Sequence, residues 1–259
     1  AATLSRHDPA REAVVHGQER LTFGQLDARA RRLASWLVER GVTQDDLVAF
    51  ALPNGPDFIS LAFAIYLAGA TPAPLSARMA VAERDAILET MRPALFADAT
   101  DVAMALASDR PPLSGDPVIA ASWKACTSGG STGRPKVIVD GRPAAFAPET
   151  GFIAIPRDGR VLVPGPLYHN APFSAAAFAL WSGSTVVTMD RYEASAALEL
   201  IERESIQWAM MVPTMMHRIM ALPLAERDAF DLSHWQTVVH TAAPMARWLK
   251  QAWIDWRGP

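Results

Sequence analysis

Apolar residues recur along this chain with two spacings, one typical of helices and the other of buried strands. The clearest helix follows Thr22, in the segment TFGQLDARARRLASWLVERG, where Thr22 and Gln25 have capping-box spacing and Gly41 ends the pattern. Its apolar stripe consists of Leu26, Ala30, Leu33 and Leu37. The three- and four-residue spacing of this stripe predicts an amphipathic helix with one buried face.

Short runs of apolar or β-branched residues predict strands between the helices. These runs are LVAFAL (47–52), ALFAD (94–98), VIAAS (118–122), VIVD (137–140), STVVTM (184–189), IQWAMMV (206–212) and TVVH (237–240). The helical segments expected between them cover 57–68, 194–204 and 245–253. Continuous apolar runs indicate strands that are buried on both faces. Their alternation with helices predicts an α/β fold class with largely parallel sheets.

The composition is typical of a globular protein that acts on small molecules. The 259 residues are half apolar, and 24 Lys and Arg residues stand against 27 Asp and Glu. Because this balance gives no strongly basic surface, we expect no nucleic-acid partner. The most apolar stretch, residues 61–71, is too short to span a bilayer, so we expect a buried helix there and no membrane span.

Cysteine and histidine usage argues for a cytoplasmic protein without a side-chain metal site. Cys126 is the single cysteine, which excludes internal disulfides and cysteine-based metal clusters. The opening segment AATLSRHDPA lacks the apolar core of a secretory leader. His217 has no second histidine or carboxylate at a ligand spacing, so no metal site is assigned to protein side chains. The methionines near it stand in apolar company, which predicts core packing.

The stretch SGGSTGRPK, residues 128–136, is poor in side-chain volume and rich in backbone N–H groups. Small residues let a chain curl around an anion, and a lysine supplies a mobile charge. The candidate ligand-binding residues are Ser128, Gly129, Gly130, Ser131, Thr132, Gly133 and Lys136. Their spacing matches neither the Walker A pattern nor the Gly-x-Gly-x-x-Gly pattern of dinucleotide folds. From composition alone, a phosphate-binding loop and a solvated surface loop both remain open.

Several segments together resemble the adenylate-forming enzymes, which comprise acyl-CoA synthetases, luciferases and the adenylation domains of peptide synthetases. Residues 128–136 resemble the phosphate loop of that family, except that Val137 stands where the family usually has glycine. The other matching segments, in the family's order, are residues 21–78, PGPLYHNAPF (164–173), MDRYE (189–193), MVPTMM (211–216) and FDLSHWQTVVHTAAPM (230–245). Ordered agreement over most of the chain is more specific than a single loop.

The resemblance implies that ATP and a carboxylic acid give an acyl-adenylate and pyrophosphate, after which coenzyme A takes the acyl group. Residues 128–133 would clamp the phosphates together with Lys136, and Mg²⁺ is expected on the phosphates. His169 would lie beside the acyl and thiol path, so His169 and Lys136 are the expected catalytic residues, with a purely structural histidine as the alternative.

The same resemblance implies two sets of binding residues. The acyl-pocket candidates are Tyr168, His169, Asn170, Ala171 and Phe173. The adenine would pack on Ala242, Ala243 and Pro244, for which ordinary strand-to-turn packing is the alternative. Ala171 is small where many relatives carry a bulkier group, so the pocket would have room for a larger acid.

By resemblance, the fold would be two stacked, doubly wound sheets with flanking helices. One lobe would span about residues 51–165, and the other would combine 1–50 with 166–259. The family's later segments carry a glutamate that assists Mg²⁺, an aspartate that holds the ribose and a mobile C-terminal domain, and none follows Met245 in this sequence. We therefore expect an N-terminal portion that is inactive alone, with an exposed apolar edge that would favour a homodimer.

Three other hypotheses stay open. The chain would belong to an adenylation domain that loads an amino or aryl acid onto a carrier protein, to a nucleotide-binding module without turnover, or to a generic α/β scaffold. The last requires all the ordered matches to be coincidental. Among acyl-CoA ligases, an aliphatic, aromatic or steroid-like acid would fit, which includes fatty acid metabolism.

Overall fold

Two largely parallel β-sheets organise the chain, which a computed structural model describes over residues 4–128, 136–146 and 153–258. The larger sheet has six strands in the order β11-β10-β8-β9-β1-β2, and all neighbours are parallel except the antiparallel pair β1 and β2. These strands are β1 (Glu12–His16), β2 (Glu19–Thr22), β8 (Arg160–Val163), β9 (Thr185–Thr188), β10 (Trp208–Met211) and β11 (Thr237–His240).

The smaller sheet is parallel and is accompanied by a hairpin. Its order is β4-β3-β5, with β3 (Leu47–Leu52), β4 (Thr71–Ser76) and β5 (Leu95–Ala97). The hairpin strands β6 (Ala125–Ser128) and β7 (Lys136–Val139) pair with each other, and β6 lies beside β4. Strand β4 contains Pro72 and Pro74, which an edge strand tolerates because half of its N–H groups face away from the ladder.

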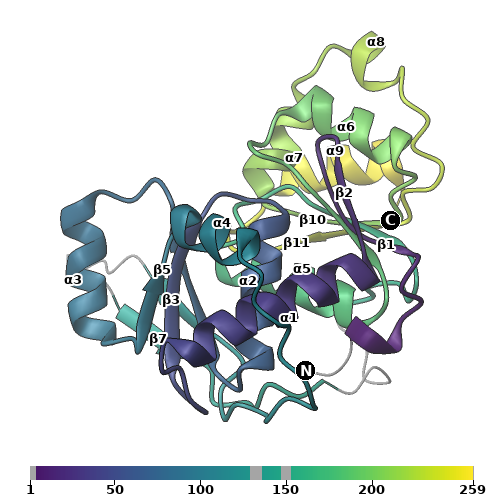
Figure 1. The fold of residues 1–259 in the computed structure, drawn as a ribbon. Coiled ribbons are helices and arrows are strands. Elements are labelled where there is room, and N and C mark those ends of the chain that lie inside the picture. The colour runs from purple at the N-terminus through teal and green to yellow at the C-terminus, as the bar shows by residue number, and fades with distance from the viewer. Residues whose placement is uncertain (1–3, 129–135, 147–152, 259) are drawn as a thin grey trace.

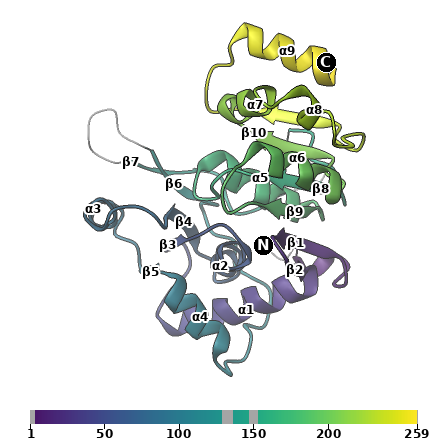
Figure 2. The ribbon, with the colours of Figure 1, turned by 90° about the horizontal axis from the view of Figure 1, so that it is seen from above.

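Helices cover both faces of the sheets (Figure 1). They are α1 (Phe23–Glu39), α2 (Pro56–Leu67), α3 (Val81–Met91), α4 (Ala99–Ala107), α5 (Asn170–Trp181), α6 (Ala194–Arg203), α7 (Pro213–Met220), α8 (Leu224–Arg227) and α9 (Arg247–Arg257), after a short 3₁₀ helix at Leu4–Arg6. Figure 2 shows α1 and α4 on one side of the molecule, α2 in the middle, and α7 and α9 on the far side.

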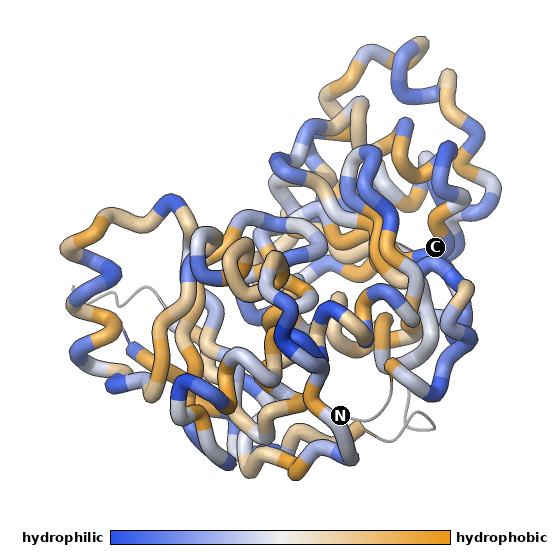
Figure 3. Tube along the Cα trace, in the orientation of Figure 1, coloured by the Kyte–Doolittle hydropathy of each residue, from blue (hydrophilic) through white to orange (hydrophobic). Residues whose placement is uncertain are grey.

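Side chains of the six-stranded sheet alternate between two cores. Val161 and Trp208 point into the core shared with α1, α2 and α5, whereas Leu162 and Ala209 point into the core shared with α6, α7 and α9. The outer helix α3 covers the smaller sheet with Ile87 and Met91, and Figure 3 shows hydrophobic and hydrophilic residues alternating along it. The predicted α/β fold with doubly wound parallel sheets is therefore confirmed.

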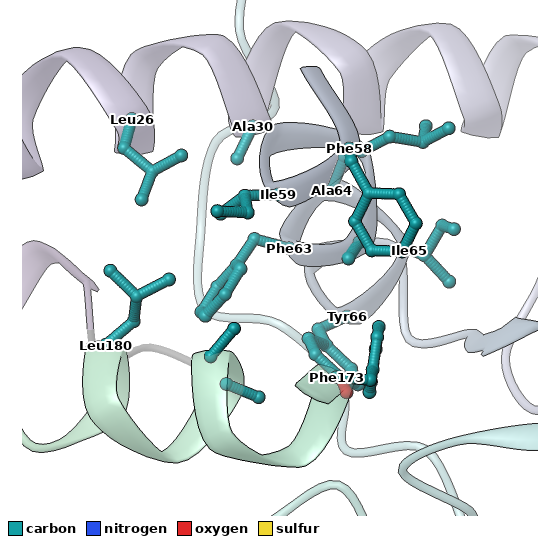
Figure 4. Close-up of a cluster of buried hydrophobic side chains, with 14 of the residues drawn as sticks. Leu26, Ala30, Phe58, Ile59, Phe63, Ala64, Ile65, Tyr66, Phe173 and Leu180 are labelled. Atoms are coloured by element: carbon teal, nitrogen blue, oxygen red, sulfur yellow. The ribbon is translucent and has the colours of Figure 1, made fainter. Parts of the chain in front are cut away.

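Helix α2 is the centre of the larger core. Of its twelve residues, only Asp57 is not buried, and its neighbours come from α1 on one side and α5 on the other (Figure 4). Phe58 packs edge-on against Phe173 with ring centroids 6.3 Å apart, and Tyr66 packs against Trp181 at 5.5 Å. The predicted buried helix is confirmed. No helix in the described ranges combines the length and the apolar character needed to cross a bilayer.

Most predicted elements are present, but one strand prediction is wrong. The capping box of α1 forms as expected, with Gln25 N donating to Thr22 Oγ1 at 3.2 Å and Thr22 N donating to Gln25 Oε1 at 2.9 Å. Residues 118–122 form no strand. The backbone there forms individual hydrogen bonds and no strand pairing. For example, Ala121 N donates to the side-chain oxygen Asp45 Oδ1 at 2.7 Å.

A cluster of ions joins the starts of β1, β2 and β8. Glu204, with a side chain that is only 3% exposed, accepts hydrogen bonds from Arg20 at 2.8 Å, from Arg203 at 3.3 Å and from Arg160. Glu12 accepts from Arg20 at 2.9 Å and from Arg160 at 2.8 Å. Burial alone would raise the pKa of Glu204, but the arginine hydrogen bonds outweigh it and lower that pKa.

Candidate functional site

The hairpin of β6 and β7 carries the glycine-rich loop at its tip. Ser128 pairs with Lys136 across the last register position, so the two ends of the loop are held side by side. The predicted residues Gly129, Gly130, Ser131, Thr132 and Gly133 lie outside the described residues. The Lys136 side chain is exposed at the base of the loop, where an ammonium is free to meet a ligand.

His169 stands at the start of α5, after the segment that follows β8. It is the N-cap residue of the helix, and its carbonyl accepts the first helical hydrogen bond from Phe173 N at 3.0 Å. The Tyr168 ring lies against the imidazole, with ring centroids 4.2 Å apart. Desolvation by the surrounding residues lowers the pKa of His169, so the imidazole is neutral at physiological pH.

The segment that carries His169 is held in place by Asn54, which follows Pro53 in the turn after β3. The Asn54 side-chain amide donates to Gly165 O at 3.1 Å and to Met189 O at 2.8 Å, and its Oδ1 accepts from Leu167 N at 2.8 Å. One side chain of the smaller sheet therefore fixes two loops of the larger sheet. These bonds hold the backbone of Gly165 and Leu167, shortly before His169.

The other acyl-pocket candidates divide into two groups. Tyr168 is half-buried, Asn170 is exposed and Ala171 is half-buried, so these three lie with His169 around the start of α5. Phe173 is 3% exposed and packs against Phe58 inside the core. The structure therefore brings four of the five candidates together at the surface, while Phe173 supports the helix from below.

The predicted adenine segment follows β11. Ala242, Ala243 and Pro244 are all exposed there, as a surface for a flat ring requires. Ala242 adopts the left-handed conformation with φ of 71°, which a residue with a Cβ adopts only at a cost. At the end of β11, the buried Nδ1 atom of His240 has no hydrogen-bond partner within the described part of the chain.

The His169 segment and the adenine segment lie at the same edge of the six-stranded sheet. Both follow strands of one parallel set, and the carboxyl ends of parallel strands meet at one edge. From β8 the chain moves to β9 on one side, and then to β10 on the other side of β8. Such a reversal of strand order opens a crevice, and ligands of open α/β sheets bind there. His169 and residues 242–244 flank this point.

A cleft lies beside the segment that precedes His169, with Pro166 and Tyr168 in its lining. It has a volume of about 200 Å³ and its lining includes Asn54, Arg78, Tyr168 and Asp190. Next to it, His16 at the end of β1 bridges two side chains of the β9 end, with Nδ1 2.9 Å from Thr188 Oγ1 and Nε2 3.0 Å from Asp190 Oδ1. Polar side chains therefore line the approach to the start of α5.

Sequence reasoning missed three residues that shape this region, namely Asn54, His16 and Lys124. His16 was marked by its position after the β-branched pair of EAVVH and before Gly17, a strand followed by a turn. Asn54 was visible only as a turn residue. Lys124 had no signal, because a lysine before a strand is usually a surface residue, whereas this one is 6% exposed.

Comparison with known proteins shows the family to which the chain belongs. Residues 2–125 and 124–259 match the family model described as AMP-binding enzyme. A feruloyl-CoA synthase of an Amycolatopsis species is 30% identical over 279 residues, covering 97% of this chain and 55% of that protein. A probable non-canonical nonribosomal peptide synthetase of Salinispora arenicola is 30% identical over 228 residues, covering 86% of this chain and 3% of that protein.

Solved structures show the same fold. The inhibitor-bound N-terminal domain of FACL13 from Mycobacterium tuberculosis superposes with a TM-score of 0.81 at 23% identity, covering 98% of this chain and 72% of that domain. The fold is that of an α/β protein with doubly wound sheets. The chain belongs to the AMP-binding enzyme family of the adenylate-forming superfamily. It spans about half the length of the curated CoA ligase that it matches.

Proposed function

We propose that the protein containing this chain activates a carboxylic acid with ATP and transfers the acyl group to coenzyme A. A carboxylate oxygen attacks the α-phosphorus and pyrophosphate leaves; the thiol sulfur then attacks the acyl carbon and AMP leaves. One observation carries the proposal: the His169 segment and residues 242–244 flank the reversal of strand order at the carboxyl edge of one sheet. The family match supports the same chemistry.

In this proposal the loop and Lys136 hold the polyphosphate. Backbone N–H groups and an ammonium offset the negative charge that two reacting anions bring together. The adenine lies on the exposed backbone of Ala242, Ala243 and Pro244. Within the described ranges, no three His, Cys, Asp or Glu side chains come close enough to hold a metal ion, so Mg²⁺ would bind mainly through the phosphates of ATP.

The acid and the thiol would meet near His169. Its neutral imidazole stacks on Tyr168, which lines the cleft, and it would donate to the acyl carboxylate or gate the thiol. Ala171 leaves room beside it, and the feruloyl-CoA synthase match favours a bulky aromatic acid. The cleft with Arg78 would admit the extended, phosphate-bearing acceptor, because an exposed guanidinium pairs readily with phosphate.

Nucleotide binding by the 259-residue chain tests the loop assignment. Isothermal titration with ATP and Mg²⁺ should show binding that Lys136→Ala weakens about tenfold or more, since a charge-assisted contact contributes about 1.5–3 kcal/mol. Lys250→Ala, an exposed lysine on α9, is the matched control and should bind as the original chain does. Equal affinities for both variants would contradict the loop's role.

In this proposal, activity requires a protein of the relatives' full length. ATP–pyrophosphate exchange should appear there with aryl or fatty acids, and His169→Ala should lower the acyl transfer more than the nucleotide affinity. The isolated 259-residue chain should show no exchange. Nucleotide binding without any exchange in the full-length protein would favour a binding module without turnover.

A second function is supported by the peptide-synthetase match, namely loading of an acid onto a carrier protein. The two functions share the acyl-adenylate and differ in the thiol. Supplying coenzyme A and a phosphopantetheinylated carrier protein separately, with a radiolabelled acid, distinguishes them by which thiol becomes acylated.

A further inference from the structure

Lys124 is a buried ammonium whose three N–H groups are all engaged. Its residue is 6% exposed. The Nζ atom donates to Ser174 Oγ at 2.8 Å and to Asn170 Oδ1, and it lies 3.9 Å from the centroid of the Trp123 ring. An ammonium has three donors, and an aromatic face takes the place of a third acceptor.

No carboxylate pairs with this charge in the part of the chain that the structure describes. Burial lowers the pKa of Lys124, while Cys126 and Asp140 raise it and Arg142 lowers it further. Taking an ammonium out of water without an ion partner costs several kcal/mol, and an apolar side chain of similar volume would fill the space at lower cost. Burying Lys124 therefore costs more free energy than filling the same space with an apolar side chain.

Those contacts join two elements of the proposed site. Lys124 comes directly before β6, the strand that ends at Ser128 where the glycine-rich loop begins. Asn170 and Ser174 are one turn apart on α5, directly after His169. Ser174 Oγ also donates to Asn170 O at 2.7 Å, and Cys126 Sγ lies 3.9 Å from Asn170 Oδ1, which closes the network around the first turn.

We propose that Lys124 is a positioning residue: its ammonium ties the first turn of α5, and with it His169, to the strand that enters the glycine-rich loop. The inference rests on the proposed function for what the loop and His169 do. The tie itself depends only on the contacts above. Its purpose is a fixed spacing between the group that meets the phosphates and the group that meets the acid.

The pKa of His169 can be used to measure whether Lys124 holds the first turn of α5 in place. That pKa is lowered by desolvation, and no charged side chain of the described residues contributes to the shift; Tyr168 is the aromatic neighbour. His169 is already an exposed residue, so loosening the first turn of α5 would remove the desolvation that remains at its imidazole. Its pKa should then rise toward the ordinary value of about 6.5. NMR titration of the histidine Cε1–H signals measures this in the 259-residue chain, with the His169 signal assigned through His169→Gln.

Two variants weaken the tie in different ways. Lys124→Met removes the charge and the three contacts, whereas Ser174→Ala removes one contact and keeps the charge. Lys250→Met removes an exposed lysine on α9 and is the control. We expect a rise in the pKa of His169 with Lys124→Met, a smaller rise with Ser174→Ala, and none with the control. If Lys124→Met does not fold, Ser174→Ala carries the test.

Two results would overturn the inference. One is an unchanged pKa of His169 in both tie variants. The other is a rise with Lys124→Met alone, which would mean that charge and not position matters. ATP titration of the same proteins tests the proposed function separately. If the chain binds no nucleotide but the pKa of His169 rises in both variants, the proposed function is wrong and the positioning role of Lys124 stands. If the chain binds nucleotide and that pKa does not change, only the positioning role is wrong.

Discussion

Replacing Asn54 should loosen the segment that carries His169, and its cost is calculable from the structure. The side chain makes three hydrogen bonds, at 2.8, 2.8 and 3.1 Å, to the backbone at Met189, Leu167 and Gly165, all of which are buried. Each is worth about 1 kcal/mol net, and unsatisfied buried partners add to the loss. Asn54→Ala should therefore lower the free energy of unfolding by about 2–4 kcal/mol.

Urea denaturation followed by tryptophan fluorescence measures this loss. With a slope of about 3 kcal/mol per M, the midpoint should fall by about 1 M. Asn54→Asp should destabilise at least as much, because it keeps the acceptor for Leu167 N but sets a negative charge against two carbonyl oxygens. Gln44→Ala is the control, since Gln44 is an exposed amide with one long contact of 3.5 Å to Ile119 O. A loss below about 0.5 kcal/mol for Asn54→Ala would refute the reasoning.

Three further predictions concern stability. Ala242→Gly should raise the free energy of unfolding, measured in urea, by about 0.5–1 kcal/mol. The left-handed conformation costs alanine about 1–2 kcal/mol, and the greater freedom of glycine in the unfolded chain offsets about half of that gain. An unchanged free energy of unfolding would show that Ala242 is not strained. Glu204→Ala should lower the free energy of unfolding by about 3 kcal/mol by leaving three arginines without their buried partner, and a thermal melt that matches the original chain would oppose this. Burial lowers the pKa of His7, and the nearby Asp158 only partly opposes this shift. The unfolded chain therefore binds a proton that the folded chain excludes, and the free energy of unfolding should fall as pH drops below about 6.5. His7→Gln should flatten this dependence in urea titrations at several pH values, and an unchanged slope would show that other groups cause it.

The sequence predicted the elements whose signals are local. The helix from Phe23 has its cap, its stripe and its stop within twenty residues, and the run LVAFAL coincides with β3. The methionines at 210, 211 and 216 are buried in the cores, as their apolar company indicated. Strand β4 gave no strand signal, because its two prolines are acceptable only when a sheet edge is available, and edges are a property of the assembled fold.

For the candidate site too, some features could be predicted from local sequence and others could not. His169 and residues 242–244 could be named from motifs, and their common sheet edge follows from strand order, which no local pattern encodes. The roles of Asn54 and Lys124 depend on partners about 111–135 and 46–50 positions away. Neither contact leaves a trace in the residues around it. The lobe boundaries near 51 and 165 remain a proposal, with β3 in the smaller sheet and β8 in the larger one.

Helix α2 has almost no surface of its own: α1 and α5 pack against it from opposite sides (Figure 4), and strands β1, β3 and β4 also contact it. Neither sheet can complete its interior without this helix, and the helix would expose a largely apolar surface if either sheet were missing. The two sheets should consequently melt in one cooperative step, and cutting the chain between them should yield halves that aggregate.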